Sequence, residues 1–199
     1  MSLSPMGLSG LGYNGYVFCD TDVWMMPPLL LLHPEIAESL IDYRFNRLEA
    51  AKQNAFSHGY KGAMYPWESA LTGAEETPVW ALSGPFEHHI TGCVAFATWN
   101  YYCATQDKEW LKTKGWPIIE ATADFWLSRV EKGSDGEHNI MNVVAADEWA
   151  ENVDNNAFTN AVAKKNVEIA ANTAKLLGLK GNPEWMKVAS TIPILKFQD

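Results

Sequence analysis

Residues 155–178 have the sequence NNAFTNAVAKKNVEIAANTAKLLG, which predicts a long α-helix over residues 155–177 that ends at Gly178. Further segments of helical patterning lie on both sides of this one. They cover residues 34–58, 87–105, 107–115, 116–131 and 184–191. Between them we find no run of alternating strands and no βαβ pattern. The sequence therefore predicts an all-α fold.

Two long stretches between these helices lack a regular pattern. Glycines and prolines interrupt every period in residues 60–86, and residues 137–153 are irregular after a turn over residues 133–136. A long loop inside a compact domain is usually functional. Because the long loops alternate with tight turns, we expect them to collect at one end of the helical stack.

An acid-rich segment lies just before the longest predicted helix. Asp147, Glu148, Glu151 and Asp154 place four carboxylates within eight positions, beside Trp149. A carboxyl group held against an indole is partly desolvated, which raises its pKa and keeps it protonated near neutral pH. Carboxylates, amides and aromatic rings also build sugar-binding clefts. Glu148 is therefore the best candidate for the general acid of a glycosidase.

Two other interpretations of this segment remain open. Acidic residues and Asn gather before helices because they cap free backbone N–H groups and favour the positive end of the helix dipole. Alternatively, Asp147, Glu151, Asp154 and Asn155 supply oxygen ligands of the kind that calcium prefers. The segment lacks the alternating ligands and the central glycine of an EF-hand. The capping interpretation is the stronger of these two.

The composition is that of a globular protein and argues against some partners. With 199 residues, of which 47% are hydrophobic and 20% charged, the chain can bury a sizeable core. Its net charge of -9 would repel the phosphates of a nucleic acid. The apolar run of residues 29–32 is far too short to span a membrane. Nine Trp and seven Tyr fit a large aromatic core, and they agree weakly with a carbohydrate ligand.

The cysteines and histidines add little about compartment or metals. The three cysteines form neither a CxxC pair nor a complete disulfide set, and the N-terminus lacks the regions of a signal peptide, so the localisation stays open. His88 and His89 are adjacent, and adjacent residues on a helix diverge by about 100°. We therefore expect one to face the core or a cleft and the other to face solvent. We expect no metal and no cofactor.

Three separated segments carry a resemblance to a known enzyme family. They have the sequences GYVFCDTD (residues 15–22), GYKGAMYPWESA (59–70) and DEWAENVDNNAFTN (147–160). In this order and with this spacing they resemble glycoside hydrolase family 65. That family includes maltose, trehalose and kojibiose phosphorylases, acid trehalases and related α-glucosidases. The likeness extends over nearly the whole chain from Gly12 onward.

The resemblance implies both a fold and a set of roles. The fold would be part of an (α/α)6 toroid with its active site in loops at one end, and the reaction would be an inverting one on an α-linked glucoside. Glu148 matches the family's general acid. Asp20 matches the acid of its F-W-D-T motif, which binds glucosyl hydroxyls, although this chain has Cys19 where the motif usually has Trp. Trp67 and Glu68 match residues at the site where donor and acceptor sugars meet.

The resemblance also implies that the chain is part of a larger enzyme. An (α/α)6 toroid needs six helix pairs, which is twelve helices, and the sequence predicts about six helices. We expect residues 1–14 to be a tag or an irregular lead-in, and residues 15–199 to form the N-terminal half of the catalytic domain. The second catalytic element would lie outside this chain, which should be inactive alone. Apolar flanks of an incomplete ring should promote self-association through the open edges.

The resemblance favours one of three functions. Residues 24–35 and 145–148 look more like the family's hydrolases than its phosphorylases. The leading hypothesis is an inverting hydrolase of a glucose disaccharide or glucosyl conjugate, with Glu148 as general acid. A disaccharide phosphorylase of the same family is the nearest alternative. A non-catalytic sugar-binding protein is the third, because Cys19 departs from the motif.

Overall fold

The computed structural model of the chain describes residues 2–7 and 9–195. The longer α-helices are α1 (Met26–Leu32), α2 (Pro34–Phe45), α3 (Leu48–Ser57), α5 (His89–Thr105), α7 (Trp116–Arg129), α8 (Ala157–Leu177) and α9 (Glu184–Thr191). Shorter elements are a 3₁₀ turn (Gly12–Gly15), two π-helical turns (Thr21–Met25 and Leu111–Gly115), α4 (Ser83–Phe86), α6 (Lys108–Trp110) and the strands β1 (Glu131–Lys132) and β2 (His138–Asn139). None of the helices in this part of the chain has the length and apolarity needed to cross a membrane.

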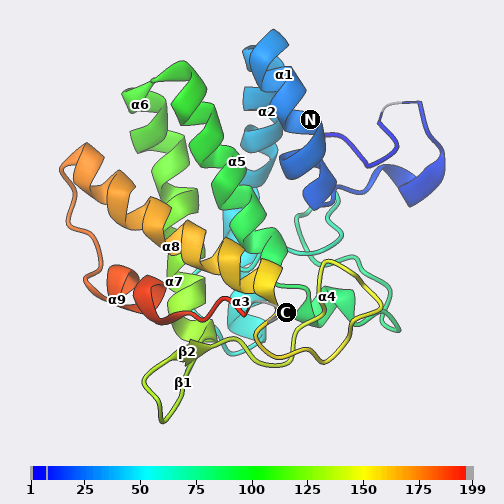
Figure 1. Cartoon of the computed structure of the whole chain (residues 1–199). Coiled ribbons are helices and arrows are strands. Elements are labelled where there is room, and N and C mark those ends of the chain that lie inside the picture. Colours follow the sequence, from blue (N-terminus) through cyan, green and yellow to red (C-terminus); the bar gives the residue numbers. More distant parts are fainter. Residues whose placement is uncertain (1, 8, 196–199) are drawn as a thin grey trace.

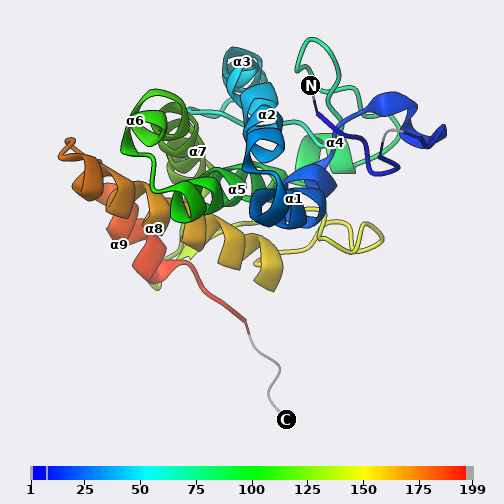
Figure 2. The same ribbon diagram turned by 90° about the horizontal axis from the view of Figure 1, so that it is seen from above.

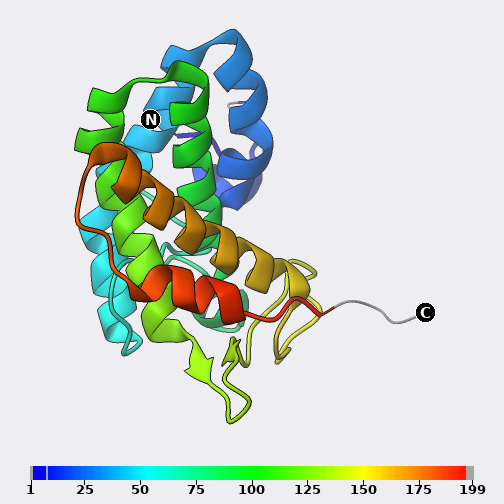
Figure 3. The same cartoon turned by 60° about the vertical axis from the view of Figure 1, so that its left-hand side comes forward.

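The long helices pack in three layers. Seen from above, α5 and α7 lie in the middle, with α2 and α3 on one side and α8 and α9 on the other (Figure 2). Helix α1 packs against α2 and α5 at one edge. In Figure 3, α8 crosses in front of α5 and α7, and α9 lies beneath it. The loops before α5 and α8 gather on the right-hand side of Figure 1, beside the N-terminal segment.

Helix α5 is central because almost all of its surface is apolar or small. Buried residues occur on every side of it, as expected for a helix enclosed by others. Helix α8 approaches it so closely at Gly92 that a Cβ atom there would clash with Val162. A buried chain of hydrogen bonds joins α7 and α8. The Trp126 indole donates to Asn166 at 3.0 Å, and Asn166 donates to the Thr122 hydroxyl at 3.1 Å. These hydrogen bonds thus fix α8 on α7, and the close approach at Gly92 brings the first turns of α5 and α8 together.

The predicted helix over residues 155–177 is confirmed as α8. Asn156 caps it by accepting a hydrogen bond from the backbone N–H of Thr159 at 3.0 Å, and Gly178 ends it in the left-handed region with φ of 66°. The prediction of one helix over residues 34–58 is wrong, because the chain turns between α2 and α3. Arg47 occupies that turn and donates hydrogen bonds to the carbonyls of Tyr43 and Ala70, each at 3.2 Å.

The helices predicted over residues 107–131 merge into one continuous helical rod, from α6 through a π-helical turn into α7. Asp107 caps its start by accepting from the backbone N–H of Trp110 at 2.9 Å. The rod ends at Arg129, two residues before the expected end. Instead, Glu131 pairs with Asn139 across the short hairpin β1–β2. Since each strand has two residues, the hairpin does not alter the all-α class.

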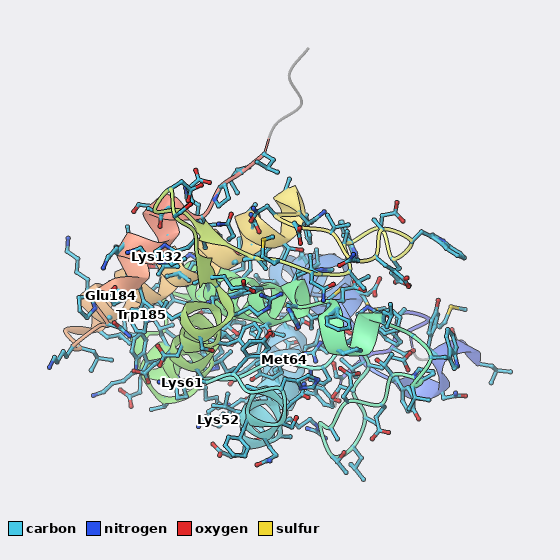
Figure 4. The ribbon with its side chains drawn as sticks, turned by 90° about the horizontal axis from the view of Figure 1, so that it is seen from below. Lys52, Lys61, Met64, Lys132, Glu184 and Trp185 are labelled. Atoms are coloured by element: carbon cyan, nitrogen blue, oxygen red, sulfur yellow. The ribbon has the colours of Figure 1, made fainter. Side chains whose placement is uncertain are left out.

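The core lies between the three layers. Met64 and Trp185 are almost fully buried, whereas the charged side chains of Lys61, Lys132 and Glu184 lie toward the outside of the ribbon in Figure 4. Trp185 also donates a hydrogen bond from its indole to Asp124 at 3.1 Å, which fixes α9 on α7. Close packing of such buried side chains holds the layers together.

One edge of the helical stack exposes apolar side chains. Leu31 and Leu32, at the end of α1, are 82% and 73% exposed, beside a shallow apolar hollow that α1 shares with Cys103 and Ala104 of α5. Exposed apolar surface of this kind favours association. We predict that the isolated 199-residue chain self-associates, and that Leu31→Glu shifts its light-scattering mass toward the monomer. Leu71→Glu, which changes an equally exposed leucine in a separate loop, should leave the mass unchanged. Equal masses for both variants would contradict an association through α1.

Candidate functional site

A pocket of about 380 Å³ lies at the N-terminal ends of α5 and α8. This volume is within the range of small-molecule sites. Four separate segments line it: the N-terminal residues up to Trp24, the side chain of Trp67, residues at the start of α5, and the loop before α8. Asp20, Trp67 and Glu148 therefore meet at one pocket, although 128 positions separate the first from the last.

Backbone pairing joins the first two of the sequence segments described above. Val17 and Ser69 exchange two antiparallel hydrogen bonds of 2.8 and 3.0 Å. Beside this pair, the rings of Phe18 and Trp67 meet edge to face with their centroids 4.9 Å apart. This pairing places Asp20 and Trp67 on the same wall of the pocket.

A buried ion pair supports the wall of the pocket that carries Asp20 and Trp67. The Arg44 guanidinium binds the Asp22 carboxylate with Nη2–Oδ2 at 2.6 Å, and Nη2 also donates to the Phe18 carbonyl at 3.0 Å. Both side chains are at least 97% buried. Burial opposes the charge on Arg44, but the charge and hydrogen bonds of Asp22 outweigh it and raise the Arg44 pKa. The pair therefore fixes the turn that carries Asp20 between Phe18 and Asp22.

Glu75 anchors the second segment. Its carboxylate accepts backbone hydrogen bonds from Trp67 at 2.8 Å, Glu68 at 3.1 Å and Thr77 at 3.2 Å. Glu68 itself is half-buried beside the pocket rather than among the residues that line it. Burial, and after it the charges of Glu75 and Glu148, raise the Glu68 pKa. The structure thus places Glu68 at the edge of the site, near enough to Glu148 to sense its charge.

The acid-rich loop before α8 divides between structural and site residues. Asn156 caps α8, Asp154 accepts from the backbone N–H of Asn142 at 2.8 Å, and Asn155 accepts from that of Ile140 at 3.0 Å. Asp147 accepts from the N–H of Trp149 at 3.2 Å. Asn156 is thus the residue that caps α8, and three of the four residues considered for calcium, Asp147, Asp154 and Asn155, bind backbone amides instead. Glu148 is the acid of this loop that lines the pocket.

The environment of Glu148 differs from the expected one. Trp149 is 96% exposed and does not line the pocket, so the indole does not desolvate the acid. The Glu148 pKa is nevertheless raised, first by partial burial and then by the charge of Asp20. The expected direction of the shift is therefore found, but the cause is the pocket and its second acid. Sequence adjacency to a Trp was misleading because neighbouring residues in a loop need not share a side.

Glu87 and His89 also line this pocket, and the sequence interpretation missed Glu87. The expectation that one histidine of the pair would face solvent is wrong, since His88 and His89 are 2% and 3% exposed. His88 accepts a hydrogen bond from Arg129 at 3.1 Å within the core, and His89 faces the pocket. The only sequence signal for Glu87 was an acid beside two histidines at the start of a helix.

The lining residues suit a neutral, polyhydroxylated ligand. Three carboxyl groups from Asp20, Glu87 and Glu148 meet aromatic rings, and no Lys or Arg occurs among the described lining residues. Carboxylates accept hydrogen bonds from hydroxyls, while aromatic faces cover the apolar side of a sugar. Cys19 also lines the pocket, and burial, followed by the charge of Asp20, raises its pKa to about 12. Its thiol is therefore neutral and a weak nucleophile.

Comparison with known proteins identifies the same family that the three segments indicated. Residues 1–192 match the glycosyl hydrolase family 65 central catalytic domain. The chain is 68% identical over 196 residues to a kojibiose hydrolase of Mucilaginibacter mallensis, covering 98% of this chain and 29% of that protein. It is 62% identical over 199 residues to a kojibiose hydrolase of Flavobacterium johnsoniae, with 100% and 29% covered.

A phosphorylase and a solved structure are also similar. A kojibiose phosphorylase of Thermoanaerobacter brockii is 45% identical over 179 residues, covering 84% of this chain and 23% of that protein. A solved structure described as a putative kojibiose phosphorylase from the human microbiome superimposes with a TM-score of 0.86 at 23% identity, over 96% of this chain and 27% of that one. The shared fold confirms the all-α class as part of an (α/α)6 toroid. The chain spans less than a third of the length of these relatives.

Proposed function

The chain belongs to glycosyl hydrolase family 65, and we propose that the full-length protein hydrolyses an α-linked glucose disaccharide such as kojibiose with inversion. Glu148 is the general acid that protonates the glycosidic oxygen. Asp20 binds hydroxyls of the glucosyl unit, and Trp67 and Glu68 contact the sugars where donor and acceptor meet. The observation that carries the proposal is the convergence of Asp20, Trp67 and Glu148 on one pocket.

The raised pKa of Glu148 supports its role. A general acid must hold its proton at the working pH, and a carboxyl whose charged form is disfavoured by burial and by a neighbouring acid does so. Inversion needs a second carboxylate about 6.5–9.5 Å away on the opposite face of the sugar, with a water between them. In our proposal that base comes from another part of the full-length protein.

Hydrolysis is the better supported of two reactions. The hydrolase relatives are 68% and 62% identical to the chain and the phosphorylase 45%. The described pocket lining is acidic, which favours a neutral ligand over phosphate. The phosphorylase similarity still makes phosphorolysis the second candidate, in which phosphate replaces the activated water.

We predict that the full-length protein releases two glucose molecules from each kojibiose at a rate independent of phosphate. Product analysis with and without added phosphate tests this, because phosphorolysis would release one glucose and one glucose 1-phosphate and would stop without phosphate. Formation of glucose 1-phosphate would therefore show that the protein is a phosphorylase and not a hydrolase. Calorimetric binding of kojibiose without any turnover would instead support a non-catalytic sugar-binding protein.

A further inference from the structure

Glu87 is a buried acid at the floor of the pocket with an unused oxygen. Its side chain is 3% exposed, and Oε1 lies 3.3 Å from Nε2 of His89. The other oxygen, Oε2, has no hydrogen-bond partner in residues 2–7 and 9–195. The same holds for Nδ1 of His89. Because unpaired buried polar atoms are costly, two of them on adjoining side chains of one pocket indicate a missing ligand.

Resting on the function proposed above, we infer that Glu87 binds the glucosyl unit as a neutral carboxylic acid, donating an Oε2–H hydrogen bond to a sugar hydroxyl. In this arrangement the neutral His89 donates from Nε2 to Oε1 of Glu87. Nδ1 then carries the lone pair and accepts a hydrogen bond from a neighbouring hydroxyl. The pair offers one donor and one acceptor, as two adjacent hydroxyls of a pyranose require.

The charges around Glu87 support its neutral form. Burial, followed by the charge of Glu148, raises its pKa to about 8, with smaller contributions in the same direction from Asp20 and Glu75, while the polar side chain of Trp67 opposes the shift. Burial also lowers the pKa of His89 to about 4, so the imidazole is neutral and offers no compensating charge. The groups that face Glu87 are thus Asp20 and Cys19 from the N-terminal segment, Glu75 and Trp67 from the loop before α4, Glu148 from the loop before α8, and His89 and Cys93 from α5.

The arrangement separates the roles of the acids in the pocket. Asp20 reaches the pocket from just before the π-helical turn Thr21–Met25 and Glu148 from the loop before α8, whereas Glu87 lies between α4 and α5, two residues before the central helix begins. Three ionised carboxyls in one small volume would repel each other, and the most buried of the three is the one that keeps its proton most readily. A neutral acid can donate where a carboxylate can only accept. Glu87 is therefore a binding residue that complements the acceptor Asp20.

The test is the pH dependence of glucose binding to the full-length protein, measured by calorimetry. Glucose is a product of the proposed reaction and is not consumed. Since only the neutral acid donates, affinity should fall above a pH of about 8, and the dissociation constant should rise on the order of thirtyfold between about pH 6.5 and about pH 9.5. In Glu87→Gln the amide donates at every pH, so this rise should disappear. Glu151→Gln, which removes an exposed carboxyl of the neighbouring loop, should retain it.

The pH dependence of glucose affinity in Glu148→Gln gives a second, independent test. Removing the charge that raises the Glu87 pKa should move the midpoint of the affinity loss to lower pH. An infrared band of a protonated carboxyl that vanishes at high pH in the wild type, and is absent in Glu87→Gln, would report the same group without any ligand. Equal pH dependence of glucose affinity in the wild type and Glu87→Gln, or no dependence in the wild type, would overturn the inference. Neither glucose affinity nor the infrared band requires hydrolysis. The role of Glu87 and the proposed hydrolytic function are therefore tested by separate measurements.

Discussion

Glu148→Gln in the full-length protein should lower the turnover of kojibiose by about 10²–10⁴-fold, the usual contribution of a positioned general acid. Glu148 lines the pocket with Asp20, and its pKa is raised by burial and by that second acid. The amide has nearly the same size and still forms hydrogen bonds, but it cannot transfer a proton to the leaving oxygen. Initial rates of glucose release measure the effect, and substrate affinity should stay nearly unchanged.

Two comparisons separate lost acid catalysis from a damaged site. An α-glucosyl fluoride has a leaving group that needs little protonation, so the variant should regain much of the wild-type rate with it. Glu151→Gln changes an exposed carboxyl three positions along the same loop and should turn over kojibiose normally. If Glu148→Gln retained wild-type turnover of kojibiose, another group would have to be the acid.

Arg44→Met should destabilise the protein by roughly 3–5 kcal/mol, because it leaves the buried Asp22 carboxylate without its partner. It also removes the hydrogen bond to the Phe18 carbonyl, which holds the turn that presents Asp20. Thermal denaturation of the full-length protein measures the loss of stability. We further expect weaker glucose binding in the folded variant, since the wall of the pocket loses its support.

The matched control is Lys52→Met, which removes a solvent-exposed ion pair with Glu49 from α3. Such pairs contribute less than about 1 kcal/mol, so this variant should melt close to the wild type. The double variant Arg44→Met with Asp22→Leu removes both charges and should recover part of the stability that Arg44→Met loses. If Arg44→Met melted like Lys52→Met, the ion pair would not be what supports the pocket wall.

Part of the site could be predicted from the sequence because short motifs in it resemble those of a known family. Asp20 and Trp67 were identified from that resemblance alone, and Glu148 from the acid-rich segment as well; the structure brings all three to one pocket. The role of each stays a prediction until the variants are measured. Glu68 was identified by the same motif but lies at the edge of the pocket. No one-dimensional pattern distinguishes a lining residue from its neighbour in a loop.

Local helix chemistry was sufficient to determine the all-α class from the sequence. The capping side chain of Asn156 and the left-handed Gly178 fix α8 through interactions within a few residues. Where the structure departs from the predicted helices, contacts between distant residues are the cause. The chain turns at Arg47, whose side chain donates to the carbonyl of Ala70, and no local helix pattern predicts this contact with a distant loop.

Only the tertiary structure decided which acids share a charge environment. Glu87 and His89 carry no motif. Burial shifts the pKa of both, and the charges of Glu148 and Asp20, which come from distant parts of the chain, raise that of Glu87 further. Conversely, Trp149 is next to Glu148 in the sequence but points to solvent. The sequence by itself determined the helices and the chemical groups available to a sugar. The meeting of four separate segments at the N-terminal ends of α5 and α8 decided which of those groups lose water, and loss of water is the first cause of the pKa shifts on which the proposed chemistry depends.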